Sequence, residues 1–311
     1  MAKRKPAELN LLLAVDKPLG CTSHDVVAKV RRAVHERRVG HAGTLDPLAT
    51  GVMIIGVGQA TRLLGMLTLD SKSYIADIHF GFETNTDDSE GEPTRVVDPV
   101  PSLFDEAFAR RVLDGFVGAS EQVPPAFSAI SIDGVRSYKR ARSGDEVVLP
   151  ARPIEVASAD LIAVSSDPES GNPVWTVAFT VSKGTYIRAL ARDIGRSAGA
   201  AAHVSALRRT ASGGIGIGKC LPVDSLDPTT ALEYALDPAA ALGLHTSDLT
   251  DMQLQDVLLG RSVPAPNDLP VDHGGRMGLV HAGQLRAIAR VDGDRFKMEH
   301  VFPQGIEGVH G

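Results

Sequence analysis

The sequence predicts an α+β fold with a mixed, mainly antiparallel sheet, flanking helices and a small, mainly β part at the C-terminal end. Three observations lead there. Several segments alternate apolar and polar residues with strand period, others carry apolar residues on one helical face, and the two kinds follow one another without regular strand–helix alternation. With 311 residues, 43% of them hydrophobic, the chain can bury one large core and a smaller one.

The individual elements follow from local patterns. Residues 11–15 form an apolar run typical of a buried strand, and Thr22 or Ser23 can cap a following helix whose valines at 26, 27, 30 and 34 share one face. The next expected elements are a strand at 52–57, a helix around 60–67, a strand at 74–82, a strand at 175–181 and a helix from about 185 to 197.

The chain is expected to divide into a catalytic domain, 1–240, and a smaller domain, 241–311. The smaller domain should hold a helix at 250–260, a Pro-rich turn at 263–270 and strands near 277–280, 285–291 and 296–301. In the larger one, 87–101 is predicted to be an exposed acidic loop, and 121–150 an insertion with a basic helical patch around Arg136, Lys139, Arg140 and Arg142.

Charge is unevenly distributed along the chain. The net charge is −6, yet residues 1–40 carry nine Lys/Arg against four Asp/Glu, and residues 183–220 carry seven against one. Two basic segments that border one site could form a phosphate-binding surface, so the acidic total does not exclude a nucleic-acid partner. The alternative is that these cations only solvate helix faces.

One loop points to chemistry. Residues 40–51, GHAGTLDPLATG, place a single carboxylate, Asp46, among small, turn-forming and neutral residues. Three glycines permit backbone angles that other residues avoid, and Pro47 fixes the chain directly after the carboxylate. A carboxylate is ionised at neutral pH and can attack an electrophilic carbon without an activating base. The alternative is an Asx-type turn in which Asp46 only accepts backbone hydrogen bonds.

This loop, with its flanks Arg38 and 52–62, resembles the signature of the bacterial tRNA pseudouridine-55 synthases, the TruB family. Further blocks resemble that family in its own order, across about residues 10–215. They are AVDKPLGCTSHDVVAKVRR (14–32), SKSYIADIHFGFETNTDDSEG (71–91), PPAFSAISIDGVRSYKRARSG (124–144), SKGTYIRALARDIG (182–195) and AHVSALRRT (202–210). The resemblance implies the pseudouridine synthase fold, and 241–311 resembles a PUA-type RNA-binding domain.

The resemblance also implies roles for nine residues. Asp46, Tyr74 and Arg188 would be catalytic: Tyr74 stacks on the target uracil and takes part in proton transfer, while the Arg188 guanidinium pairs with Asp46 and keeps it ionised and oriented. His41 would help displace the base from the RNA stack. The other implied substrate-binding residues are Tyr186 and Leu207, which line the uracil pocket, and Lys183, Arg208 and Arg209.

Without the resemblance, the same residues have plainer interpretations. Tyr74 would pack in the core, His41 would be a turn residue, and the arginines at 188, 192 and 196, four apart, would form a solvated basic helix face. Two positions depart from the family pattern. Phe127 and Ser131 stand where the family usually has Tyr and Lys, which removes a phenol hydroxyl and a cation from the insertion.

The implied reaction needs no cofactor. Forming pseudouridine breaks the N–C glycosidic bond of uridine, rotates the uracil and rejoins it through C5, with no net redox change. The sequence shows no metal-ligand cluster and no nucleotide-binding fingerprint, so no metal is expected either. Whether Asp46 attacks C6 of the base or C1′ of the ribose, or first supports elimination, stays open at the level of sequence.

The expected substrate is uridine 55 in the T-arm of tRNA, modified by a cytoplasmic monomer that needs neither membrane nor partner protein. Two alternatives stand beside this expectation. A guide-RNA-dependent pseudouridine synthase shares the GHAGTLDP-like loop, but the insertion at 121–150 favours the stand-alone enzyme. A non-catalytic RNA-binding or RNA-chaperone protein is disfavoured by the triad Asp46, Tyr74 and Arg188, because binding alone needs no carboxylate aimed at an anionic polymer.

Overall fold

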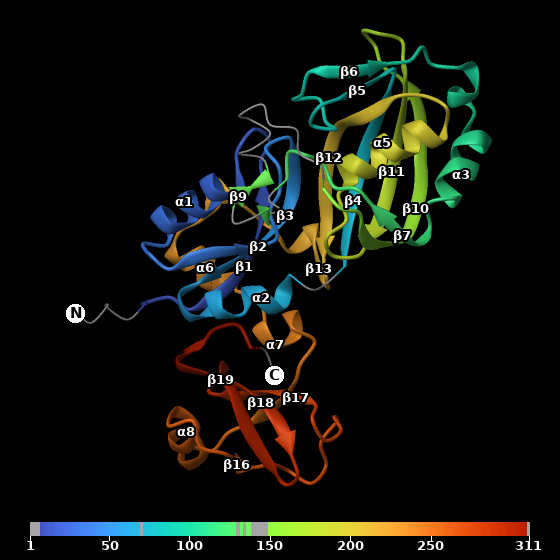
Figure 1. The fold of residues 1–311 in the computed structure, drawn as a ribbon. Coiled ribbons are helices and arrows are strands. Elements are labelled where there is room, and N and C mark those ends of the chain that lie inside the picture. Colours follow the sequence, from blue (N-terminus) through green and yellow to red (C-terminus); the bar gives the residue numbers. More distant parts are fainter. Residues whose placement is uncertain (1–6, 69–70, 129–130, 133–134, 138–148, 310–311) are drawn as a thin grey trace. The chain divides into compact units, whose positions relative to one another are not determined.

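The computed structural model describes residues 7–68, 71–128, 131–132, 135–137 and 149–309 (Figure 1). Contacts group these residues into two compact units. The first unit comprises residues 7–47, 51–68 and 213–309, and the second comprises residues 48–50 and 71–212. Each unit combines helices with mainly antiparallel strands, which confirms the predicted fold class.

The first unit begins with a small mixed sheet. Strand β1 (Leu11–Lys17) runs antiparallel to β3 (Ala49–Val57) and parallel to the short β14 (Leu221–Pro222), and β2 (Val39–Ala42) pairs with β3. The apolar runs predicted at 11–15 and 52–57 are therefore confirmed as strands. Helix α1 (Ser23–Ala33) packs on this sheet with its valine face, within a core that includes Leu13, Met53 and Ile55.

The start of α1 is fixed by a capping box. The Thr22 hydroxyl accepts from the Asp25 N–H at 3.1 Å, and the Asp25 carboxylate accepts from the Thr22 N–H at 2.8 Å, so Thr22 rather than Ser23 is the cap.

The prediction of a single helix around 60–67 was wrong. The chain forms a 3-10 turn, η1 (Gly58–Arg62), and then one turn of helix, α2 (Leu64–Leu67), because the Leu63 N–H bonds three residues back, to Ala60 O, and breaks the α-helical repeat.

The C-terminal part of the first unit is a five-stranded sheet in the order β15-β17-β18-β19-β16. The expected helix is α8 (Asp251–Leu258), and the three expected strands are β17, β18 and β19, so these predictions are confirmed. The strand bounds are β15 His245–Asp248, β16 Val263–Pro264, β17 Arg276–His281, β18 Gln284–Asp292 and β19 Arg295–Ile306. The connecting elements are β13 (Ile215–Gly216), η3 (Ile217–Lys219), η4 (Val223–Ser225), α6 (Pro228–Glu233) and α7 (Pro238–Ala241).

The C-terminal sheet shares a hydrophobic core with the N-terminal strands of the same unit. Phe302 of β19 is fully buried in a cluster that also contains Leu12 of β1 and Ile54 of β3. Two further contacts join the same parts: the Glu307 N–H donates to Asn10 O at 2.8 Å, and the Arg62 guanidinium lies 5.0 Å from the centre of the Phe302 ring. Residues beyond 240 therefore complete a core that begins at residue 12.

The second unit is built on a five-stranded antiparallel sheet in the order β12-β4-β11-β10-β7, with helices α3 and α5 beside it (Figure 1). Its long strands have alternately buried and open positions, as the strand period predicted. The bounds are β4 Lys72–Phe80, β7 Gly118–Gln122, β10 Arg152–Ser166, β11 Pro173–Val181, β12 Ala202–Ser212, α3 Glu106–Asp114 and α5 Ile187–Ser197. Smaller elements are β5 (Phe82–Thr84), β6 (Pro93–Val96), η2 (Pro101–Phe104), β8 (Ser131–Ile132) and β9 (Val135–Arg136).

Two sequence-based expectations for the second unit need correction. The strand predicted at 74–82 ends at Phe80, because Gly81 takes a φ of +116° that turns the chain into the β5–β6 hairpin. The stretch 87–101 is not an exposed loop throughout, since Asp87 and Asp88 are buried at its start and part of it forms β6. Of the basic patch in the insertion, Arg136 lies in β9, and its other three members lie outside the described residues.

Candidate active site

In the first unit, Asp46 lies in the loop between β2 and β3, and its immediate neighbours are held on both sides. The Ser23 hydroxyl accepts from the Leu45 N–H at 2.9 Å and lies 3.0 Å from Leu45 O. Pro47 O accepts from the Gly20 N–H at 3.0 Å and from the Lys17 ammonium at 3.3 Å. These contacts fix the backbone before and after Asp46, so the carboxylate is presented from a rigid loop.

Sequence reasoning explained the loop by its own glycines and proline and missed these outside contacts. Lys17 is a fully buried lysine at the end of β1, and Ser23 is buried in the first turn of α1. A buried charged or hydroxyl group is uncommon without a partner. The only hint in the sequence was that Lys17 and Ser23 are polar residues next to apolar runs. Nothing in the sequence connects them to a loop more than twenty residues away.

His41 lies in β2, five residues before Asp46. Its ring meets that of His24 edge-on, with the ring centres 5.9 Å apart. His41 is half-buried on the strand that leads into the Asp46 loop, and its partner His24 is exposed in the first turn of α1. The sequence placed His41 in the loop 40–51, whereas the structure has it in strand β2, and the contact with His24 was not predicted.

In the second unit, strand register gathers three of the predicted site residues. Tyr74 of β4 is paired with Arg209 of β12, and Ala76 is paired with Leu207, so Tyr74, Leu207 and Arg209 point to one face of the sheet. Tyr74 and Leu207 are 8% and 7% exposed. A mostly buried tyrosine beside a leucine offers an apolar surface with one polar end, which suits stacking on a planar base.

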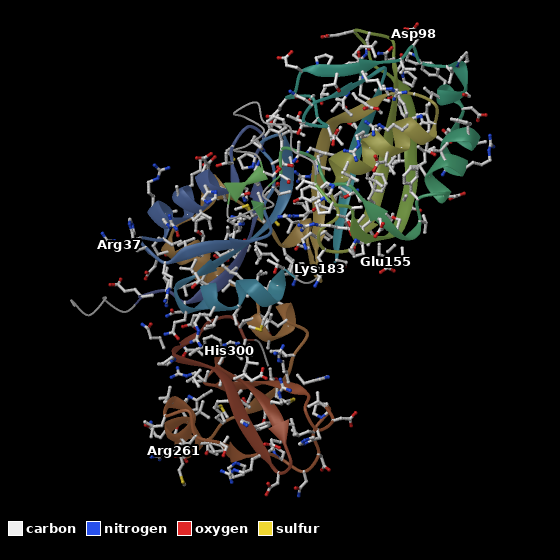
Figure 2. The ribbon with its side chains drawn as sticks, viewed as in Figure 1. Arg37, Asp98, Glu155, Lys183, Arg261 and His300 are labelled. Atoms are coloured by element: carbon white, nitrogen blue, oxygen red, sulfur yellow. The ribbon has the colours of Figure 1, made fainter. Side chains whose placement is uncertain are left out.

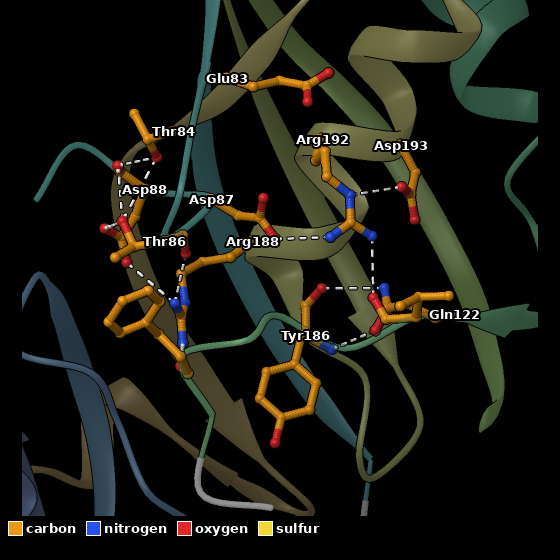
Figure 3. A network of polar contacts seen from close by, with 12 residues as sticks. Glu83, Thr84, Thr86, Asp87, Asp88, Gln122, Tyr186, Arg188, Arg192 and Asp193 are labelled. Carbon is orange, nitrogen blue, oxygen red and sulfur yellow. Dashed lines mark hydrogen bonds and ion pairs between the residues drawn. The ribbon is translucent and has the colours of Figure 1, made fainter. Parts of the chain in front are cut away.

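Arg188 lies in the first turn of α5 and is almost completely buried. Its two terminal nitrogens point to different groups: Nη1 donates to Thr86 O at 2.6 Å and lies 3.3 Å from the Asp88 carboxylate, and Nη2 donates to Phe127 O at 3.0 Å (Figure 3). The guanidinium fork therefore joins the Thr86–Asp88 turn to the start of the insertion. Asp88 was missed as a partner because the sequence placed it in an exposed loop.

The arginines that follow on α5 pair in the same way, one helical turn apart. Arg192 Nη1 lies 2.8 Å from the Asp87 carboxylate, and Arg196 Nη2 lies 2.6 Å from the Glu83 carboxylate. The solvated basic face considered for this helix is therefore wrong for Arg188 and Arg192, which are largely buried against Asp88 and Asp87 (Figure 3). Arg196 also pairs with a buried acid, Glu83, but its own side chain is about half exposed. Burial opposes ionisation of Glu83, but hydrogen bonds from Arg196 and Arg95 outweigh it and hold the pKa of this carboxyl below its usual range.

Asp87 behaves in the opposite way. Burial raises the pKa of its carboxyl to about 6, and the attraction of Arg192 offsets this only in part. Because the folded-state pKa lies above that of the unfolded chain, the contribution of Asp87 to stability is greatest below about pH 4 and is lost as pH rises through about 6.

Asp87→Asn should remove this dependence on pH. We expect the unfolding free energy of the wild type, relative to the variant, to increase by on the order of 1–3 kcal/mol between about pH 7 and pH 4. Thermal unfolding followed by circular dichroism at several pH values measures the difference, with Asp98→Asn, an exposed aspartate, as the control. A difference that stays constant with pH would contradict the raised pKa.

The remaining basic site residues differ in exposure. Lys183 lies at the surface in the turn between β11 and α5 (Figure 2), while Arg208 is half-buried and donates to the Thr50 hydroxyl at 3.2 Å. Arg209 is only 1% exposed. A surface contact from Arg209 to phosphate does not fit this burial, so of the two arginines at 208 and 209 only Arg208 suits such a contact.

Comparison with known proteins decides the family. The sequence model for the TruB family pseudouridylate synthase (N-terminal domain) matches residues 31–187, half of the chain. The chain belongs to this family. The matched range contains Asp46 and Tyr74 and ends one residue before Arg188. The family resemblance of the sequence motifs is thereby confirmed, and the protein is an enzyme of the pseudouridine synthase class.

Individual TruB family relatives are similar over most of their length. The tRNA pseudouridine synthase B of Mycobacterium avium is 44% identical over 292 residues, which cover 91% of this chain and 93% of that protein. That of Corynebacterium aurimucosum is 42% identical over 256 residues, covering 82% and 85%. Among solved structures, a Cbf5–Nop10–Gar1 complex matches with a TM-score of 0.67 at 24% identity, over 94% of this chain and 84% of that chain. This likeness shows a shared fold.

For this TruB family member, the described residues contain no group of three or more His, Cys, Asp or Glu side chains that could hold a metal ion. The described helices include none that is long and apolar enough to cross a membrane. The first unit presents a carboxylate on a fixed loop. The second presents a mostly buried tyrosine and an arginine whose guanidinium contacts two backbone carbonyls. An ionised carboxylate held in this way is suited to nucleophilic attack.

Proposed function

We propose that this enzyme isomerises uridine 55 in the T-loop of tRNA to pseudouridine. The observation that carries the proposal is the similarity to relatives named tRNA pseudouridine synthase B, at 42–44% identity over 80% or more of this chain. The rigid presentation of Asp46 supports it, because a carboxylate held by backbone contacts on both sides is suited to nucleophilic attack and is not needed for RNA binding.

In the proposed reaction, the target uridine first leaves the tRNA stack, at a cost of a few kcal/mol. Stacking on Tyr74, with Tyr186 and Leu207 beside it, offsets this cost, and His41 helps to displace the base from the RNA. Asp46 then attacks C6 of the base or C1′ of the ribose, or first supports elimination. By each route the N1–C1′ bond breaks, the uracil rotates, a C5–C1′ bond forms, and the proton lost from C5 is balanced by one gained at N1. Where a bond to Asp46 forms, it breaks again before release, so the carboxylate is regenerated.

Several finer points belong to the same proposal. Arg188 pairs with Asp46 during the reaction, and Lys183 and Arg208 bind tRNA phosphates. The enzyme acts on the T-arm as a cytoplasmic monomer, without guide RNA, partner protein, metal or other cofactor. Residues 1–240 carry the chemistry, and 241–311 contribute to RNA binding as a PUA-like part.

Pseudouridine mapping on an unmodified tRNA transcript tests the proposed function. Purified protein should convert position 55 without guide RNA and in the presence of a chelator, and a transcript with cytidine at position 55 should gain no pseudouridine. Tight tRNA binding without product would favour the non-catalytic alternative. Product that forms only when guide RNA and partner proteins are added would favour the guide-dependent alternative.

Arg188→Lys should slow the chemical step far more than it weakens tRNA binding. A lysine ammonium cannot reproduce the fork that reaches Thr86 O and Phe127 O together, nor a two-pronged contact to Asp46. Losing a charge-assisted hydrogen bond predicts a rate roughly ten- to a hundredfold lower in single turnover with saturating enzyme. Arg110→Lys, which alters a surface ion pair with Glu106, is the control. An unchanged rate with much weaker binding would reassign Arg188 to phosphate contact.

A further inference from the structure

The first residues of the insertion are fastened to helix α5 at several points. Gln122, at the end of β7, is 2% exposed and makes a reciprocal pair with the backbone of Tyr186: its Oε1 accepts from the Tyr186 N–H at 2.9 Å, and its Nε2 donates to Tyr186 O at 3.1 Å (Figure 3). One side-chain amide therefore satisfies both backbone groups of the residue that precedes α5.

Two arginines continue this attachment along the helix. Arg192 Nη2 donates to Val123 O at 3.0 Å while Nη1 contacts Asp87, and Arg188 Nη2 donates to Phe127 O. The segment 122–127 thus gives one amide side chain and two carbonyls to the first two turns of α5. All these contacts lie within the second unit.

The contact with Gln122 matters because of where Tyr186 stands. Tyr186 is the N-cap of α5, with extended backbone angles and no cap from its own side chain. The N–H groups at a helix start have no partner within the helix, and a buried one without a partner costs free energy. Gln122 supplies that partner from another element, and so fixes the direction in which the chain enters the helix that carries Tyr186 and Arg188.

We propose that Gln122 is a positioning residue for the pseudouridine synthase reaction, and that Arg192 supports it by holding the next residue, Val123. Gln122 acts through Tyr186 and Arg188: it sets the N-terminal turn of α5, so that the phenol ring and the guanidinium fork are in place before RNA binds. The catalytic part of this inference rests on the proposed function, whereas the structural part, order at the start of α5, does not.

Gln122→Met tests the proposal, since methionine keeps the length and bulk of the side chain and removes both hydrogen bonds. We expect single-turnover pseudouridine formation at saturating enzyme to be about five- to fiftyfold slower, with tRNA affinity within threefold of wild type. The matched control is Gln304→Met in the first unit, because Gln304 likewise accepts one hydrogen bond, from Gln59, and donates one, to Ala7 O. This control should leave the rate unchanged.

Amide hydrogen exchange gives a readout that does not depend on activity. Peptides covering the first turn of α5 should exchange faster in Gln122→Met than in wild type or Gln304→Met. Unchanged exchange and an unchanged rate would overturn the proposal, and so would a rate defect that disappears at saturation. If the wild type makes no pseudouridine, the proposed function fails, while hydrogen exchange still decides the structural role of Gln122.

A second variant, Arg192→Lys, is used if Gln122→Met does not fold. A lysine at this position cannot hold Val123 and Asp87 together. Its reaction rate and its amide exchange are compared with those of Arg110→Lys.

Discussion

Asp46→Asn should abolish pseudouridine formation while leaving tRNA affinity within a few fold of wild type. Asparagine has nearly the shape of aspartate but is not a nucleophile, so the step that breaks the glycosidic bond loses its attacking group. The contacts that hold the loop come from Ser23, Gly20 and Lys17 to the backbone of Leu45 and Pro47, and the substitution touches none of them. The loop should keep its position.

We expect a rate at least about a thousandfold lower in single turnover. Binding is measured separately, because Asp46→Asn also removes a negative charge near an anionic ligand and can tighten it slightly. Asp98→Asn, which makes the same change at an exposed position, should match wild type in both measurements. Substantial residual turnover by Asp46→Asn would remove the nucleophile from the proposed mechanism, even if uridine 55 proves to be the substrate.

Ending the chain after Ala240 should destabilise the first unit, not merely weaken RNA binding. The sequence predicted that 241–311 form a separate, smaller domain. However, four fully buried side chains from beyond that point belong to the core that contains Leu12 and Ile54: Leu285, Ile288, Phe302 and Ile306. Burying one such side chain contributes about 1.5–3 kcal/mol, so losing four removes an amount comparable to the whole stability of a domain.

The expected result is a shortened protein that is aggregated or lacks a cooperative thermal transition. Phe302→Ala in the full-length chain provides a milder test, with an expected loss of about 3–5 kcal/mol in unfolding free energy. Phe104→Ala, at a half-exposed position of the second unit, should cost much less. A shortened protein that unfolds cooperatively within a few degrees of the full-length Tm would instead support an independent domain that ends at 240.

Much of the fold could be predicted because local patterns decide it. The valine stripe of α1, the capping residue Thr22 and the alternation along β4 were each sufficient to place an element, and the loop around Asp46 was evident from its composition. The core that the C-terminal sheet shares with the N-terminal strands could not be predicted in this way. Strand β18 has buried residues on both faces, and a mainly apolar strand does not reveal which parts of the chain cover each face.

In the candidate site, the residue types were predictable but their partners were not. The arginines at 188, 192 and 196 showed helical spacing, yet their acids at 83, 87 and 88 lie about a hundred residues earlier, in a segment whose polarity suggested a surface loop. Buried ion pairs between distant segments leave no periodic signal, since each member alone looks like a surface residue. Gln122 was not predicted either, because its partner Tyr186 is also distant in sequence and a single glutamine looks like a surface residue.

The pairing along α5 also changes how much charge this chain can offer to RNA. Of the seven basic residues in 183–220, three are matched by internal acids and Arg209 is buried, which leaves Lys183, Arg208 and Lys219. Each phosphate neutralised by a protein cation releases condensed counterions, and this release sets how steeply affinity falls with salt. Raising the salt concentration should therefore weaken tRNA binding less than the count of cations in this segment suggests, and a larger share of the affinity would come from the basic segment 1–40, from shape and from base stacking.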